Sequence, residues 1–299
     1  GASLPRMGSE CTAGELDCRL FEVYDEYGLA LRTGLLCLGV QLACTALFKA
    51  LPAGGSFDTT RFPVFLAHQV VALPLMILLT YMGCAAYFSP AADSQLADAA
   101  GAHGRSTYPV AAGRDISLVI LGMQLFWDLP VTLHAEMYDA VNLAHHVGMA
   151  ISAALSLSPY VQYWVPFFGG LIEASSIPLV LADVFHPKRY QDFAEATAGR
   201  SKANFLLRVT FLLAYLLVRC VWFPATVAFG VGPDLLSELR GAEDAATALS
   251  PALALLLILP LTFLQLHWGR LLVRQAMKAL APPPDDKLAY DQLDDQHVL

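Results

Sequence analysis

The sequence predicts an all-α, polytopic integral membrane protein with about seven transmembrane helices. Hydrophobic residues make up 56% of the 299 residues, and charged residues make up only 15%. This composition is too apolar and too poor in charge for an ordinary soluble domain. In addition, apolar stretches recur along nearly the whole chain, at or above the roughly 20 residues that a helix needs to cross the hydrocarbon of a bilayer. These two observations together predict the fold class.

Seven stretches qualify as spans, because each is an apolar run that only single polar or ionisable residues interrupt. In chain order they cover residues 29–50, 62–88, 115–133, 137–157, 160–184, 204–230 and 249–277. The longer connections, none of them large enough to hold a core, are 89–114, 185–203 and 231–248. One membrane domain, residues 29–280, is therefore expected between an acidic amino-terminal segment, 1–28, and an acidic tail, 281–299.

The distribution of Lys and Arg predicts the orientation, because positive residues near the ends of spans are retained on the cytoplasmic side. Basic residues gather in the connection 185–203 and at the end of the last span: Lys188, Arg189, Arg200, Lys202, Arg270, Arg274 and Lys278. These two regions must share a side of the membrane, so the carboxyl terminus is expected in the cytoplasm. An odd number of spans then places the acidic amino-terminal segment on the non-cytoplasmic side.

The two ends of the chain carry signals of their own. Cys11 and Cys18 lie in the amino-terminal segment, where a local disulfide and two free thiols are both open possibilities. The tail begins with three prolines and is acidic, a composition that does not bury enough apolar surface to fold alone. We expect a flexible tail, and both ends are candidates for contact with membrane-protein partners. The sequence holds no basic cluster that would indicate nucleic acid.

Ionisable side chains within the spans indicate a functional site, because each costs a few kcal/mol in hydrocarbon and usually faces a bundle interior or a cavity. In the fourth span, a rotation of about 100° per residue puts Asp139, Asn142 and His146 on one polar stripe. His145 points about 100° aside. The two adjacent imidazoles therefore cannot do the same job on a straight helix.

The fifth span adds a second polar face. Glu173 and Ser176 share this face with Gly169, and the pair Gly169 and Gly170 would let another helix or an acyl chain come close. At about 1.5 Å of rise per residue, Asp128, the two histidines and Glu173 fall in one slab between the midplane and the cytoplasmic surface. We therefore expect one shared cavity, enclosed by the third, fourth and fifth spans.

Each residue of this expected cavity has a predicted role. His145 and His146 are the candidates for catalysis, with Asp139 or Glu173 orienting an imidazole. The residues expected to line a lipid cavity are Asp128, Asn142, Gly169, Gly170 and Ser176. The competing interpretation is that polar pairs only hold helices together. That interpretation is favoured for two pairs outside this group, His68 with Gln69 and Gln265 with His267.

Two further predictions limit the site. Arg219, near the exterior end of its expected span, is predicted to extend its guanidinium to the membrane interface. No metal is expected, because neither HExxH nor a paired CxxC occurs and adjacent histidines diverge. A metal that bridges His146 and Glu173 is the weaker alternative.

Four runs of residues, taken together, resemble the TLC domain. They are "WDLP" around Asp128, Asp139 placed six residues before the pair "HH", "GGLIEASSIPLVL" from Gly169, and "LQLHWGRLL" in the last span. The TLC family comprises translocating-chain-associating proteins, longevity-assurance ceramide synthases and the ceroid lipofuscinosis membrane protein. The resemblance covers roughly residues 60 to 280 and implies an endomembrane or plasma-membrane bundle of six or seven helices around a lipid-sized cavity.

The resemblance also implies what the site does. In the ceramide synthase branch the paired histidines transfer an acyl group from acyl-CoA, and His145 and His146 match that pair. The synthase pattern is incomplete here, because Glu173 stands where that branch has an Asp, and Ser176 and Val180 stand where it has further acidic residues. The run "Glu-x-Ser-Ser" resembles the non-synthase branches instead. We expect a protein that binds, senses or handles membrane lipids, without a cofactor. The alternatives are an N-acyltransferase with acyl-CoA as co-substrate and a non-catalytic subunit of a larger membrane complex.

Overall fold

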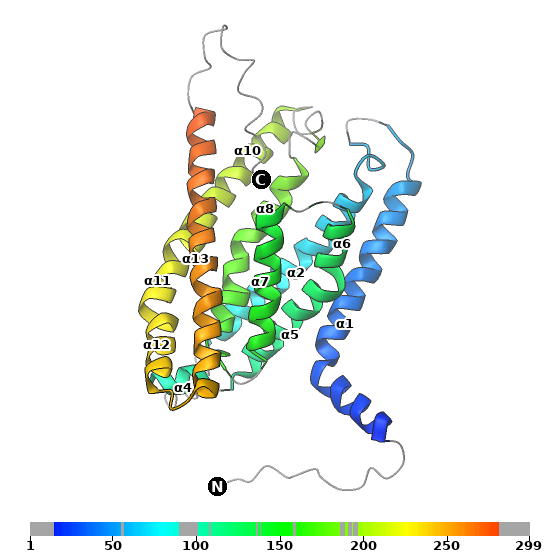
Figure 1. The fold of residues 1–299 in the computed structure, drawn as a ribbon. Coiled ribbons are helices and arrows are strands. Elements are labelled where there is room, and N and C mark those ends of the chain that lie inside the picture. Colours follow the sequence, from blue (N-terminus) through cyan, green and yellow to red (C-terminus); the bar gives the residue numbers. More distant parts are fainter. Residues whose placement is uncertain are drawn as a thin grey trace.

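The chain folds as a long bundle of helices that run between two ends (Figure 1). The computed structural model describes residues 15–54, 57–89, 101–107, 109–135, 137, 139–157, 160–185, 189–190, 193 and 197–280, with the backbone alone for 15–26 and 280. Within these ranges there is no β-strand. The prediction of an all-α membrane bundle is confirmed. The proposed Cys11–Cys18 disulfide and the tail 281–299 fall outside what is described.

Among the described residues, six helices are long and apolar enough to cross a membrane. They are Tyr27–Ala50 within α1 (Glu15–Ala50), α2 (Pro63–Tyr87), Ala111–His134, Pro166–Val184, Ala198–Gly241 and Ala245–Ala279 within α13 (Ala245–Leu280). The fourth predicted span corresponds to α7, Ala140–Leu155, which at 16 residues is shorter than the others. Six of the seven expected spans are therefore confirmed in length.

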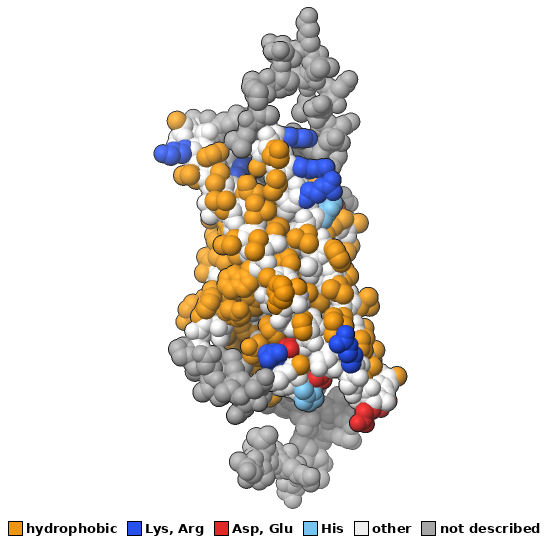
Figure 2. All heavy atoms as spheres, turned by 90° about the vertical axis from the view of Figure 1, so that its left-hand side faces the viewer, with side chains coloured by type: hydrophobic (Ala, Val, Ile, Leu, Met, Phe, Trp, Pro, Cys, Tyr) orange, Lys and Arg blue, Asp and Glu red, His pale blue; other side chains and the backbone are white. Residues whose placement is uncertain are grey.

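The surface of the bundle has the banding expected of a membrane protein. Figure 2 shows a broad hydrophobic belt, with Lys and Arg side chains gathered above it and side chains of both charges below it. The carboxyl ends of α8 (Ser176–Val184) and α13 and the start of α10 (Ala198–Tyr215) lie together at the upper end (Figure 1). The two basic regions of the sequence thus share one end of the bundle.

Prolines shape the long helices by forcing short π-helical segments into them. A proline lacks the N–H and its ring clashes with the carbonyl four residues before it. In three places the amide of the residue directly before a proline therefore donates to the carbonyl five residues back, which is the π-helical pattern. These bonds are Leu129 N to Gln124 O before Pro130, Phe223 N to Val218 O before Pro224, and Gly232 N to Val227 O before Pro233.

The sixth span is longer than predicted. Residues 231–248 were expected as an exterior connection, but the helix continues through α12 (Gly232–Gly241) and α13 begins at Ala245. The short helix α4 (Ala102–Thr107) holds α12 in place, because Arg105 donates from Nε and Nη2 to Asp234 at 2.8 and 2.5 Å. These hydrogen bonds raise the pKa of Arg105. A contact between residues so far apart in the chain cannot be predicted from the local amino-acid composition.

Backbones meet most closely where two glycines face each other. A Cβ on Gly83 of α2 would collide with the backbone of Gly170 and Leu171, and one on Gly170 would collide with the backbone of Gly83. Gly170 therefore allows the backbone of α2 to come close. Gly169 beside it faces the side chains of Ile116 and Ile120.

This contact gives a stability prediction. Replacing Gly83→Ala should lower the stability of the protein by about 1–3 kcal/mol, because the added methyl group has no room against the opposing backbone. The matched control is Gly39→Ala on α1, where an added Cβ meets nothing within 4 Å. Thermal unfolding of the two purified variants in detergent measures the difference; equal melting temperatures would contradict the close contact.

Candidate functional site

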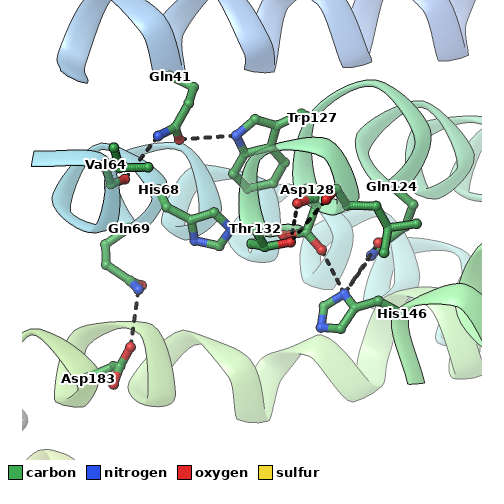
Figure 3. Close-up of polar contacts among 11 residues, drawn as sticks. Gln41, Val64, His68, Gln69, Gln124, Trp127, Asp128, Thr132, His146 and Asp183 are labelled. Atoms are coloured by element: carbon green, nitrogen blue, oxygen red, sulfur yellow. Dashed lines mark hydrogen bonds and ion pairs between the residues drawn. The ribbon is translucent and has the colours of Figure 1, made fainter. Parts of the chain in front are cut away.

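Asp128 is a buried carboxylate in the interior of the bundle that bridges two histidines (Figure 3). Its Oδ1 lies 2.8 Å from Nε2 of His68 on α2, and its Oδ2 lies 2.7 Å from Nδ1 of His146 on α7. An ionised carboxylate only accepts hydrogen bonds, so the two ring nitrogens that face it carry the protons. Three helices are thereby joined through one side chain.

The residues around Asp128 fix its position. Asp128 is the last residue of the π-helical segment Gln124–Asp128, and Thr132 of the next turn donates to its backbone carbonyl at 2.5 Å. From the same segment, Oε1 of Gln124 lies 3.3 Å from Nδ1 of His146 (Figure 3). The ring of Trp127 stacks on His68 with 4.7 Å between centroids. Gln124, Trp127 and Asp128, all from this π-helical segment, thus contact the imidazoles of His68 and His146.

A second layer of contacts connects this cluster to α1. Nε1 of Trp127 donates to Oε1 of Gln41 at 3.2 Å, and Nε2 of Gln41 donates to the carbonyl of Val64 at 2.9 Å. Both side chains are buried, with Gln41 only 1% exposed. The orientation of the indole, and through it that of His68, is therefore set by hydrogen bonds and packing together.

His145 faces a different neighbourhood from His146. Its ring packs edge-on against His146 and against Trp268 of α13, with centroids 5.3 and 5.1 Å apart. Its Nδ1 is buried and has no hydrogen-bond partner within the described ranges. The neighbouring imidazoles thus divide as helical phase predicts: one pairs with a carboxylate, and the other packs toward α13.

Asp139 does not orient either imidazole, in contrast to the predicted polar stripe. Its side chain caps the amino terminus of α7, where Oδ1 accepts from the amides of Val141 and Asn142 at 2.9 and 2.8 Å. It lies exposed at the start of the helix. The carboxylate that contacts His146 is Asp128, which the sequence analysis placed only in the cavity wall.

Glu173 pairs with Arg219, so its predicted role beside the histidines is replaced by an ion pair. Nη2 of Arg219 lies 3.2 Å from Oε2 of Glu173 and 3.0 Å from Oγ of Ser176, and Nε lies 2.7 Å from Oγ of Ser175. Arg219 is 6% exposed, so the prediction that it extends to the interface is wrong. In hydrocarbon a buried charge requires such a partner.

The ion pair continues into α13 through one amide. Nη1 of Arg219 approaches Oε1 of Gln265 at 3.4 Å, and the hydroxyl of Tyr215 donates to the same oxygen at 2.8 Å. Arg219 lies in the π-helical segment Leu216–Trp222 and Glu173 in a short 3-10 stretch, Leu171–Ser175. Irregular helical turns thus carry Asp128, Arg219 and Glu173 alike.

A largely apolar cavity of about 130 Å³ lies beside these clusters, between α5 (Ala111–Met123), α7, the stretch 161–172, the helix 223–235 and α13. Most of its lining is Ile, Leu, Val, Phe, Ala and Met. The lining residues that carry a polar side-chain atom are Ser117, His145, Ser152, Ser156, Trp164 and Gln265. A cavity with apolar walls and few polar groups is the usual form of a site for a small apolar ligand.

The predicted site residues divide between this cavity and its surroundings. His145 and Gly169 line the cavity. Its lining does not include Asp128, Asn142, Gly170 or Ser176, nor does it include His146, Asp139 or Glu173. Asp128 contacts the two histidines, Ser176 joins the Arg219 cluster, and Gly170 packs against α2.

His68, Gln69 and Gln265 were predicted to hold helices together, and each of them does so: His68 pairs with Asp128 at 2.8 Å, Gln69 with Asp183 at 3.2 Å, and Gln265 with Tyr215 at 2.8 Å. What was not predicted is that His68 and Gln124 join the cluster around Asp128 and His146. The signal that was available is that His68 and Asp128 are both ionisable groups in spans, where each requires a partner. Within the described ranges, no three His, Cys, Asp or Glu side chains converge as metal ligands.

Comparison with known proteins matches the chain to a protein family. The family model described as the TLC domain matches residues 99–274, more than half of the chain. Neither a curated protein nor a solved structure matches.

The bridge at Asp128 predicts an asymmetry between two aspartates. Asp128→Asn should destabilise the fold by about 2–5 kcal/mol, because the amide presents N–H groups to a ring nitrogen that also donates. Asp139→Asn should change stability little, since Asn caps a helix about as well as Asp does. Chemical or thermal unfolding in detergent compares the two; equal losses would refute the bridging role.

Proposed function

The chain belongs to the TLC-domain family, and from this premise we propose that it binds the hydrocarbon chain of a membrane lipid in the cavity between α5, α7 and α13. It is a multi-pass integral membrane protein, and its family links it to lipid metabolism or sensing. The proposal is lipid handling without synthase activity.

The apolar lining of the cavity is the observation that carries this proposal. The lining follows α7 from His145 to Leu155, ten residues or roughly 15 Å at the rise of an α-helix. Burial of apolar surface is favourable and does not depend on direction, so side chains such as Phe168 and Ile258 suit a flexible hydrocarbon chain. The polar groups His145 and Gln265 suit a ligand that also has a polar part.

The arrangement of the two histidines favours binding over acyl transfer. A general base must reach the substrate, and an orienting group normally holds it. His146 has an orienting carboxylate, Asp128, but does not line the cavity. His145 lines the cavity, but its Nδ1 has no partner among the described residues. The two requirements are thus divided between neighbouring residues, although the Asp128–His146 pair keeps an acyltransferase as the second candidate.

The orientation in the membrane follows from the charge distribution. We infer that the end of the bundle that carries Arg189, Arg200, Lys202 and Lys278 faces the cytoplasm, by the excess of positive residues on that side. The cavity then extends from the middle of the bundle toward the opposite surface, because α12, which contributes Leu235, ends there (Figure 1).

Filling the cavity tests the proposal. Ala254→Phe, which places a ring in the cavity wall of α13, should reduce the lipid that copurifies with the protein, because the ring occupies the space of the hydrocarbon chain. The control is Leu256→Phe on the outer side of the same helix, at a side chain that is 67% exposed. Native mass spectrometry after mild detergent extraction measures bound lipid. Equal occupancy in both folded variants would contradict binding in this cavity.

Incubation with labelled acyl-CoA and amine acceptors tests the second candidate. We expect no acylated product from the purified protein, because neither histidine combines access to the cavity with an orienting carboxylate. A product that forms with the wild-type protein and is lost in both His145→Ala and His146→Ala would establish the acyltransferase instead. Thermal unfolding of these two variants controls for loss of the fold.

A further inference from the structure

One amide in the cavity wall has a fixed orientation. Oε1 of Gln265 accepts from the hydroxyl of Tyr215 at 2.8 Å and faces Nη1 of Arg219 at 3.4 Å. A guanidinium can only donate, so the amide atom that faces it is the carbonyl oxygen of the carboxamide. Gln265 belongs to the lining of the cavity. Its nitrogen Nε2 is therefore the amide atom that is left to bind a ligand there.

This nitrogen offers two N–H donors. Within the described part of the chain, hydrogen bonds are found for Oε1 and for the backbone carbonyl of Gln265, but none for Nε2. Gln265 as a whole is only 1% exposed, so an acceptor within the cavity would complete the hydrogen bonding of Nε2.

The hydroxyl groups of the cavity do not compete for this role. Ser152 donates to the carbonyl of Gly148 at 2.8 Å. The hydroxyl oxygens of Ser117 and Ser156 lie 2.6 Å apart, so one of the two donates to the other, and each also lies within hydrogen-bond distance of a backbone carbonyl. All three protons thus have acceptors within the protein. They leave a wall that a hydrocarbon chain can contact without breaking a hydrogen bond.

We propose that Gln265 determines specificity by donating from Nε2 to the carbonyl oxygen of a lipid ester or amide whose hydrocarbon chain occupies the cavity. This inference rests on the proposed function, and it adds the chemical class of ligand. His145 lies at the same end of the cavity, because its ring contacts Trp268, one helical turn beyond Gln265. The ester or amide group is therefore held between α7 and α13, and the chain runs toward Trp164 and Leu235.

A set of single-chain probes that differ in one group tests the inference. Methyl myristate and N-methyl myristamide carry a carbonyl group, and myristyl methyl ether has the same chain without one. Competition with a fluorescent fatty-acid analogue, on the full-length protein in detergent, gives relative affinities. We expect the ester or the amide to bind about 3- to 10-fold more tightly than the ether, as the loss of one hydrogen bond implies. Preference between ester and amide tells a glycerolipid source from a sphingolipid source.

Variants assign the preference to its residue. Gln265→Met should abolish the difference between carbonyl and ether probes while retaining the chain-binding volume, and Tyr215→Phe should retain the difference, because it removes a contact on the other side of the amide. Nε1 of Trp164 is a buried donor of the cavity wall without a partner in the described ranges, so Trp164→Phe is the matched control and should also retain the difference.

The outcomes separate this inference from the function on which it rests. If none of the probes competes, the proposed lipid site itself fails. If the ether competes as well as the ester and the amide in the wild-type protein, hydrocarbon binding stands and the role of Gln265 is wrong. Loss of the preference in Trp164→Phe and its retention in Gln265→Met would assign carbonyl recognition to the other end of the cavity. The wild-type comparison decides even if Gln265→Met does not fold.

Discussion

The structure depends on one constraint: in the interior of a membrane bundle every charged group must find its partner within the protein. Asp128 meets this requirement with two imidazoles, and Arg219 meets it with Glu173 and three hydrogen-bonding side chains. Because the residues of each cluster come from different helices, pairing the charges also fixes the positions of those helices relative to one another. The cavity lies beside both clusters, so two of its polar residues are held by them: His145 packs against His146, and Gln265 contacts Arg219.

Prolines supply the geometry that these clusters require. A regular α-helix would place successive side chains at a fixed rotation, whereas each π-helical turn adds a residue and shifts every side chain after it. Asp128 and Arg219 both lie in such turns, shortly before Pro130 and Pro224. The prolines are therefore the local cause, and the inward position of the charged groups is the result. Packing between glycines, as at Gly83 and Gly170, then brings the backbones close enough for the side chains to meet.

Composition and hydropathy predict the fold class and six of the spans, because the bilayer imposes a length and polarity that are visible locally. The extension of the sixth helix through α12 was not predictable in this way, since the Arg105–Asp234 contact that secures it comes from a distant segment. The site was predicted in part. Counting at 100° per residue separates His145 from His146, but it fails around Asp128 and Glu173, where π and 3-10 turns break the period. For Asp139, a carboxylate directly before a helix was itself a capping signal.

The π-helical turn at Gln124–Asp128 has a consequence for how the chain tolerates changes in length. Such a turn is equivalent to one residue inserted into an α-helix, so removing a single residue from it would restore the ordinary register. Restoring that register would rotate one part of the helix against the other by about 100°. Asp128 would then face away from His146, and Trp127 would turn away from His68. A loss of one residue, which a loop would absorb, would here separate three helices that share a single carboxylate.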